Sequence, residues 1–157
     1  MKVIGYDPFL KKEDFPKMVE RMEDRDKLFS ESDFVSVHIP STPETKKSIG
    51  MREFRLMKPT SYFINIARGD LAVEEDLAAA LRAGVIKGAA IDVYEKEPPP
   101  AEHPFFKLDN VILTPHNASH TKEAMIRMAV QAAQGIDEVL SGKIPTWPVN
   151  KLRKITL

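Results

Sequence analysis

Five short apolar runs, separated by polar turns and helix-forming segments, most constrain how this chain can fold. Each run is apolar almost throughout and does not alternate apolar with polar residues, which is typical of parallel strands covered by helices on both faces. The runs occupy residues 2–6, 34–38, 61–66, 88–92 and 111–114. We therefore predict an α/β fold built on a parallel sheet.

Two segments carry the local signals of a helix. Glu74–Ala83 consists mainly of strong helix formers, and Gly84 follows it as a residue suited to a left-handed cap. A longer helix is expected to begin after Thr121 and to end before Gly142, because its apolar residues recur at steps of three and four. The apolar stripe of this helix is expected to pack in the core.

Prolines mark where regular structure is interrupted. Pro104 and the three prolines at 98–100 fall between the fourth and fifth apolar runs, so we predict a loop there rather than a helix. Residues 145–157 are predicted to form an extended C-terminal strap that leaves the domain. Residues 1–144 are then expected to form one domain, since 157 residues suit a single domain.

The composition restricts the partners of the chain. Its 23 lysine and arginine residues balance 23 aspartate and glutamate residues, and no stretch concentrates positive charge. We therefore expect neither nucleic acid nor an anionic membrane as a partner, and favour a small soluble ligand. No apolar stretch approaches the ~20 residues of a membrane span. Because cysteine is absent, thiolate chemistry is excluded and a reducing, cytoplasmic location is favoured.

Polar residues stand at or just after the carboxyl end of every predicted strand. In an open parallel sheet these ends share one edge, and ligands bind in the crevice outside that edge. We therefore expect five side chains from distant parts of the chain to meet in one cleft. They are Asp7, His38, Arg68, Asp92 and His116.

Asp7 closes the first apolar run. An acidic residue at the end of such a strand can accept hydrogen bonds from the adenosine ribose of NAD, and its charge would repel the 2′-phosphate of NADP. The position therefore favours NAD. The alternative is that Asp7 and Pro8 form only a turn.

Four motifs follow one another in the chain: DFVSVHIPSTPET at 33–45, INIARG at 64–69, AIDVYEKEPP at 90–99 and LTPH at 113–116. In this order and spacing they resemble the successive signatures of the D-isomer-specific 2-hydroxyacid dehydrogenases, which include phosphoglycerate, glycerate, glyoxylate and lactate dehydrogenases. The resemblance covers residues 2–150. It implies a Rossmann-like, doubly wound parallel sheet and an NAD-dependent oxidoreductase that acts on a small 2-hydroxy or 2-oxo acid.

The resemblance implies three catalytic residues. Arg68 would bind the substrate carboxylate, because guanidinium matches a planar carboxylate with two parallel hydrogen bonds. His116 would exchange a proton with the substrate oxygen, and Glu97 would hold and orient its imidazole ring. The alternatives are that Arg68 only pairs with Asp70 or Glu74 at the surface, and that Glu97 and His116 are ordinary surface residues.

The resemblance also implies a set of cofactor contacts, most of which are backbone or packing contacts. For Thr45 the alternative role is structural, as the cap of a short helix after Pro43. The set consists of Asp7, His38, Ile39, Pro40, Thr45, Ile66, Ala67, Arg68, Asp92, His116, Ala118 and Ser119.

No metal site is predicted. His116 and His120 stand four residues apart, a spacing that zinc sites use, but Pro115 argues against a helix there and no third ligand follows at a standard spacing. Asn117 and His120 also depart from the usual pattern of the family. These departures put in doubt whether the hydrogen bonding of His116 and the substrate preference follow those of the family.

The 157 residues contain no Gly-x-Gly-x-x-Gly loop, which in the family follows a strand lying between the first two strands found here. We therefore expect a Rossmann-like sheet truncated at its N-terminal strand and glycine-rich loop, with weakened NAD binding and impaired turnover. The two neighbouring strands are expected to close up, or the gap to be covered by a homodimer partner or by a missing N-terminal portion. The alternative function is that of a non-catalytic truncated paralogue or fragment that serves as a binding or oligomerisation module.

Overall fold

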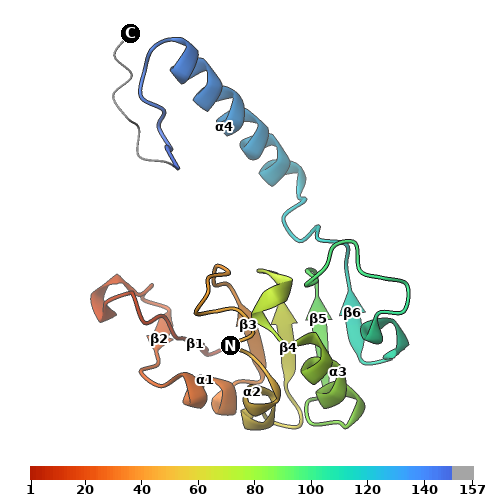
Figure 1. The fold of residues 1–157 in the computed structure, drawn as a ribbon. Coiled ribbons are helices and arrows are strands. Elements are labelled where there is room, and N and C mark those ends of the chain that lie inside the picture. Colours follow the sequence, from red (N-terminus) through yellow and green to blue (C-terminus); the bar gives the residue numbers. More distant parts are fainter. Residues whose placement is uncertain (150–157) are drawn as a thin grey trace. The chain divides into compact units, whose positions relative to one another are not determined.

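In a computed structural model of the chain, which describes residues 1–149, two parallel sheets form within the unit Met1–His116 (Figure 1). The smaller sheet pairs β1 (Val3–Gly5) with β2 (Val19–Arg21). The larger sheet has the order β3-β4-β5-β6, with bounds Phe34–Val37, Tyr62–Asn65, Gly88–Ile91 and Val111–Leu113. Each of the five apolar runs therefore forms a strand, and the predicted α/β fold with parallel strands is confirmed.

The register of the larger sheet places the ends of its four strands at one level. Val37 lies opposite Asn65, Asn65 opposite Ile91, and Ile91 opposite Leu113. Because all four strands run in the same direction, the loops that follow them leave the sheet side by side. This register places the loops with the predicted catalytic residues along one edge.

The small sheet was not predicted in full. β2 has three residues, Val19–Arg21, and so short a run shows no periodicity in the sequence. It pairs with β1 at residues Val3–Gly5, and the two sheets stay separate within residues 1–116. The expectation that β1 would close up against β3 is therefore wrong.

Three α-helices belong to this unit, and Figure 1 shows them along the larger sheet. They are α1 (Arg25–Glu31), α2 (Met51–Leu56) and α3 (Glu74–Arg82). The prediction of α3 is confirmed, and Gly84 follows it with a φ of +64°. The loop between β5 and β6 contains one short 3-10 helix, Pro104–Lys107, so the proline-based prediction of a loop holds for most of this connection. Two other 3-10 turns occupy Lys12–Asp14 and Gly69–Leu71.

The core of the unit lies between the larger sheet and its helices. Phe54 of α2 meets Phe63 of β4 edge to face, with ring centroids 5.3 Å apart, and both side chains are fully buried. Burial alternates along β3: Val35 and Val37 are buried, whereas Phe34 is 59% exposed. The expectation that the strands are buried on both faces is therefore wrong for β3 within this unit.

The second unit begins at Asn117 and contains α4 (Lys122–Leu140). The Thr121 hydroxyl accepts a hydrogen bond from the amide of Ala124, and Gly142 follows the helix with a φ of +72°, so both predicted ends are confirmed. No side chain of α4 is buried, so the expected core packing of its apolar stripe is not found within the described residues. No helix among residues 1–149 is both long and apolar enough to cross a membrane.

The described part of the predicted strap, 145–149, has no regular secondary structure. Thr146 donates two hydrogen bonds to the Glu138 carboxylate, one from its amide and one from its hydroxyl, each 2.7 Å long. Residues 150–157 of the strap lie outside the described residues. The domain boundary at residue 144 stays a prediction.

Candidate active site

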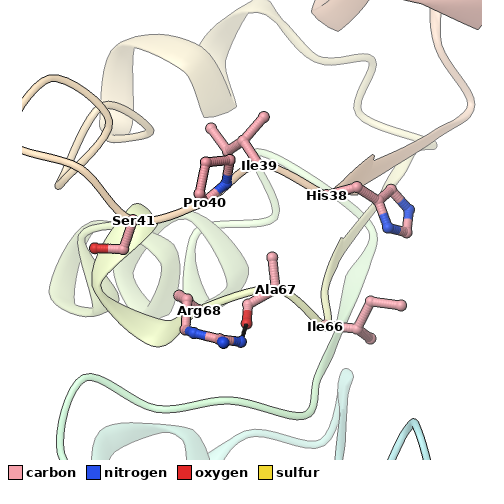
Figure 2. Close-up of a pocket in the computed structure, with 7 residues that line it drawn as sticks. All are labelled: His38, Ile39, Pro40, Ser41, Ile66, Ala67 and Arg68. Carbon is pink, nitrogen blue, oxygen red and sulfur yellow. Dashed lines mark hydrogen bonds between the residues drawn. The ribbon is translucent and has the colours of Figure 1, made fainter. Parts of the chain in front are cut away.

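A cleft of about 590 Å³ opens at the carboxyl edge of the larger sheet, between the loops that follow β3 and β4 (Figure 2). In Figure 2 the two loops run side by side, with His38 and Ile66 pointing to the same side. Six of the seven lining residues belong to the predicted cofactor contacts, and Ser41 is the addition. The lining residues are His38, Ile39, Pro40, Ser41, Ile66, Ala67 and Arg68.

The loop after β3 is held by hydrogen bonds within itself. The Thr45 hydroxyl donates to the carbonyl of Pro40 at 2.8 Å and accepts from the amide of Thr42 at 2.7 Å. Thr45 therefore holds a turn, and no helix that it could cap begins before Met51. At the start of the loop, the Ser36 hydroxyl lies 2.8 Å from Nε2 of His38.

The loop after β4 is shaped by Asn65, a residue that the sequence interpretation did not single out. Its side chain is 2% exposed, its Nδ2 donates to the carbonyl of Arg68 at 2.9 Å, and its Oδ1 accepts from the amide of Ala67 at 3.1 Å. A carboxamide can donate and accept at once, so Asn65 alone serves both ends of this loop. The available sequence signal was a polar amide as the last residue of an otherwise apolar strand.

Replacing Asn65 with leucine is expected to destabilise the protein by roughly 2–4 kcal/mol, because two buried backbone groups lose their partners. Urea unfolding followed by circular dichroism measures this difference. The control is Ser36→Ala, on the exposed side of the adjacent strand. Equal unfolding midpoints for the two variants would show that the loop does not depend on the Asn65 amide.

Asp70 ties the two loops of the cleft together. Its carboxylate accepts from the Ser41 hydroxyl at 2.8 Å and lies 3.3 Å from Nζ of Lys46, and its carbonyl accepts from the amide of Lys47 at 2.8 Å. The Ser41 hydrogen bond, with a smaller contribution from Lys46, holds the pKa of Asp70 below its usual value. Asp70 therefore stays ionised and pairs with Lys46.

Arg68 has no carboxylate partner among the described residues. Its Nη1 donates to the carbonyl of Ala67 at 2.6 Å, which folds the guanidinium back along the loop in Figure 2. The alternative that Arg68 only pairs with Asp70 or Glu74 is therefore wrong, since Asp70 pairs with Lys46 and Glu74 with His103. A cationic group without an anionic partner thus lies at the cleft.

Glu97 and His116, which stand 19 positions apart, form a pair. Oε2 of Glu97 lies 2.7 Å from Nδ1 of His116, and Oε1 accepts from the amide of Tyr94 at 3.0 Å. The predicted contact between carboxylate and imidazole is therefore present. His116 also has a φ of +53°, a left-handed conformation that costs free energy in a residue other than glycine and is common at functional sites.

The hydrogen bond from His116, followed by the one from the Tyr94 amide, lowers the pKa of Glu97 below its usual value. The pKa of Glu97 is lower in the folded chain than in the unfolded chain. The pair therefore stabilises the folded chain at pH values above the ordinary carboxyl pKa. This contribution is lost as the pH falls through the folded-state pKa. At neutral pH Glu97 is therefore an anion.

Gly69 brings the loop of Arg68 against the loop of Glu97. A Cβ atom on Gly69 would lie 1.9 Å from the carbonyl carbon of Tyr94 and 2.3 Å from the amide nitrogen of Glu95. The two backbones therefore touch at a position where only glycine fits. This contact fixes Arg68 relative to the loop that carries Glu97.

Residues 1–118 match the model of the NAD-binding domain of the D-isomer-specific 2-hydroxyacid dehydrogenases. The chain belongs to this family. The resemblance found in the sequence and the Rossmann-like fold that it implied are both confirmed.

Relatives within the 2-hydroxyacid dehydrogenase family match nearly all of the chain. A glyoxylate reductase of Thermofilum pendens is 46% identical over 96% of this chain and 45% of its own length. A D-3-phosphoglycerate dehydrogenase of Methanocaldococcus jannaschii is 40% identical over 99% of this chain and 31% of its own length. The chain therefore spans about half or less of the relatives that it matches.

Solved structures of the family agree with this fold. A D-isomer-specific 2-hydroxyacid dehydrogenase from Lactobacillus delbrueckii ssp. bulgaricus, in its NAD-complexed form, superimposes with a TM-score of 0.85 at 31% identity, covering 95% of this chain and 49% of that structure. Two other matched structures are complexed with a phosphorylated cofactor: an acyclic imino acid reductase with NADPH and D-Arg, and a glyoxylate/hydroxypyruvate reductase from Sinorhizobium meliloti with NADP and sulfate.

Some of the cofactor contacts predicted for this NAD-binding domain do not line the cleft. The Asp7 carboxylate, after β1, accepts from the amides of Phe9 and Leu10 at 2.8 and 3.2 Å and so forms a turn. Asp92 is 3% exposed at the end of β5, and its Oδ1 accepts from the Thr114 hydroxyl at 2.5 Å. The single cleft expected from all five strand ends is therefore found only for the loops of His38 and Arg68.

Ala118 and Ser119 belong to the second unit, in the turn before α4, and their cofactor contacts stay predictions. Among residues 1–149, no group of three or more histidine, aspartate or glutamate side chains is placed to hold a metal ion.

Proposed function

We propose that this chain carries the nicotinamide-side half of the active site of an NAD-dependent D-2-hydroxyacid dehydrogenase, which interconverts a small 2-hydroxy acid and its 2-oxo acid. The observation that carries the proposal is the 2.7 Å contact between Glu97 and Nδ1 of His116. It leaves Nε2 as the ring nitrogen that can exchange a proton with a ligand. The family membership of residues 1–118 supports the reaction class.

His116 is proposed as the acid and base of the reaction. Since the Glu97 carboxylate accepts a hydrogen bond from the N–H of Nδ1, the ring is oriented, and Nε2 is the nitrogen proposed to face the substrate oxygen. In reduction Nε2 gives its proton to that oxygen, and in oxidation it takes the proton back.

Arg68 is proposed to bind the substrate carboxylate. Its guanidinium has no carboxylate partner among the described residues, so it can bind an anion without breaking an ion pair of its own. Two parallel hydrogen bonds would fix the plane of a 2-oxo acid. Gly69 holds Arg68 close to the loop of Glu97, so the carboxylate and the carbonyl of one ligand can be bound together.

The cleft residues fit a nicotinamide ring. Ile39 and Ile66 line the cleft and are 38% and 41% exposed, so two apolar side chains are available to cover a planar ring. When bound, the nicotinamide supplies or accepts the hydride. We propose backbone and packing contacts from His38, Pro40 and Ala67, and further contacts from Asp92, Ala118 and Ser119.

We propose NAD as the cofactor in preference to NADP, because the Asp7 carboxylate would repel a 2′-phosphate. Thr45 is proposed to act by holding the loop of Pro40.

The isolated 157-residue polypeptide contains no Gly-x-Gly-x-x-Gly loop, so we propose that it binds NADH weakly. The homodimer, the cytoplasmic location and the domain boundary at residue 144 stay predictions, as does the alternative of a non-catalytic module.

Replacing Arg68 with lysine tests the substrate role. The variant is expected to lose about ten- to a hundredfold in kcat/KM for glyoxylate or hydroxypyruvate, because lysine keeps the charge but not the paired hydrogen bonds. NADH oxidation is followed by absorbance, and NADH binding by fluorescence. The control is Arg55→Lys, at an exposed position of α2.

Three outcomes are distinguishable. Equal kcat/KM values for Arg68→Lys and the wild type would reject Arg68 as the carboxylate-binding residue. A larger loss in NADH affinity than in kcat/KM would assign Arg68 to the cofactor. A wild-type polypeptide that neither binds NADH nor reduces either acid would favour the alternative of a non-catalytic module.

A further inference from the structure

A second pair of carboxylate and imidazole groups lies largely buried beside the proposed active site. Oε2 of Glu74, in the first turn of α3, is 3.0 Å from Nε2 of His103, and the two side chains are 15% and 6% exposed. The two residues stand 29 positions apart, and neither has a role in the reaction proposed above. Because the pair is largely buried, leaving either group without its hydrogen-bond partner would cost free energy. Both side chains are therefore held in this contact.

Glu74 contacts both sides of the loop that carries Glu97. Its Oε1 accepts from the amide of Glu95 at 2.9 Å, while its Oε2 faces His103. Glu95 precedes Glu97 by two residues and His103 follows it by six. One carboxylate on a helix thus fastens the beginning and the end of this loop.

The surroundings of His103 determine which nitrogen carries its proton. Nδ1 faces the amide of Phe105 at 3.4 Å and accepts from it, so the proton lies on Nε2 and is donated to Glu74. The ring packs against Tyr94 and Phe105, with centroids 5.7 and 4.8 Å away. His103 therefore has one orientation and one tautomer in the folded chain.

The fastened loop leads directly to His116. The amide of Tyr94 donates to Oε1 of Glu97, and the Tyr94 hydroxyl donates to the carbonyl of Thr114 at 3.2 Å. Thr114 lies two residues before His116, whose Nδ1 faces Oε2 of Glu97. A continuous set of contacts thus runs from Glu74 to the imidazole that we propose as the acid and base.

We propose that Glu74 and His103 are positioning residues, which hold the loop of residues 94–103 so that the Glu97 carboxylate meets Nδ1 of His116. The inference rests on the proposed function for its catalytic consequence, but the placement of Glu97 can be measured without turnover. Both residues act through Glu97, and neither lines the cleft.

Glu74→Gln tests the carboxylate. A carboxamide can accept from only one of the two donors, the Glu95 amide and the His103 ring, so one side of the loop is released. The matched control is Glu75→Gln, because Glu75 is the next residue of α3 and is exposed. His103→Gln and His103→Asn form a second pair, since glutamine can place a donor near the position of Nε2 and the shorter asparagine cannot.

Side-chain nitrogen NMR of His116 is the deciding measurement. We expect wild type, Glu75→Gln and His103→Gln to show His116 protonated at Nδ1, and Glu74→Gln and His103→Asn to show both tautomers. A merely structural role would lower the melting temperature and leave the His116 tautomer unchanged. If Glu74→Gln does not fold, the comparison of His103→Gln with His103→Asn decides.

The kinetic readout separates this inference from the proposed function. With NADH and a 2-oxo acid, Glu74→Gln is expected to lose about ten- to a hundredfold in kcat, with the KM for NADH changed less than about threefold. A wild type that shows the Nδ1 tautomer but neither binds NADH nor reduces a 2-oxo acid counts against the proposed function and leaves the positioning role supported. An unchanged His116 spectrum in Glu74→Gln and His103→Asn overturns the positioning role, whatever the activity.

Discussion

Replacing His116 with asparagine is expected to lower the rate of 2-oxo acid reduction by roughly a hundred- to ten-thousandfold, the usual contribution of a positioned acid or base. The imidazole is held by Glu97 at 2.7 Å, and no other histidine is joined to this carboxylate among the described residues. Asparagine is chosen because it tolerates the left-handed conformation at this position, where φ is +53°. The backbone should therefore stay in place while the proton donor is lost.

Single-turnover reduction with NADH measures this effect, and NADH affinity serves as its internal control. Glu97→Gln should give an intermediate loss of about tenfold, since an amide oxygen still accepts from Nδ1 but carries no charge. If His116→Asn retained activity within about tenfold of the wild type, the proton would come from another group. The assignment of His116 would then be wrong.

The placement of the cleft residues could be predicted because it depends on the strands alone. Once His38 and Arg68 are recognised as following parallel strands, the register of Val37 with Asn65 brings their loops together. The pairing of Glu97 with His116 followed from the family resemblance rather than from any periodicity in the sequence. These predictions needed only the strand positions and the order of the motifs.

The contacts that hold the loops could not be predicted in the same way. Asn65 reads as one polar residue at the end of a strand, and only the turn after it shows that both of its amide groups are used. Glu74 and His103 are 29 residues apart, and each has an ordinary local explanation as a helix-start acid and a residue before proline. Their contact depends on how α3 and the loop after β5 pack, which no local pattern encodes.

The short elements were missed for a related reason. β2 has three residues and α2 has six, so both are too short to show a recognisable hydrophobic periodicity in the sequence. α1 buries only Phe29, and its start signal is the side chain of Asp24, which accepts from the amide of Asp26 at 2.9 Å. Such elements form because neighbouring strands and helices cover them, and tertiary packing outweighs local preference there.

Replacing Gly69 with alanine is expected to destabilise the protein by about 3 kcal/mol or more and to lower kcat/KM by about a hundredfold. The added Cβ would lie 1.9 Å from the Tyr94 carbonyl carbon and 2.2 Å from its oxygen, so two backbones must separate because no side chain can rotate away. The separation would move Arg68 away from the loop of Glu97, and the substrate carboxylate and carbonyl would no longer be bound in one geometry.

Urea unfolding and steady-state kinetics measure the two effects of Gly69→Ala, and Gly135→Ala is the matched control. A Cβ on Gly135 in α4 meets no atom within 4 Å, so this substitution should be neutral or stabilising by up to about 1 kcal/mol, since alanine favours a helix more than glycine does. If Gly69→Ala unfolded at the same urea concentration as the wild type, the close contact of the two loops would be refuted. If it were destabilised but kept its kcat/KM, the contact would serve stability alone, and the position of Arg68 would be set by Asn65 and Asp70 instead.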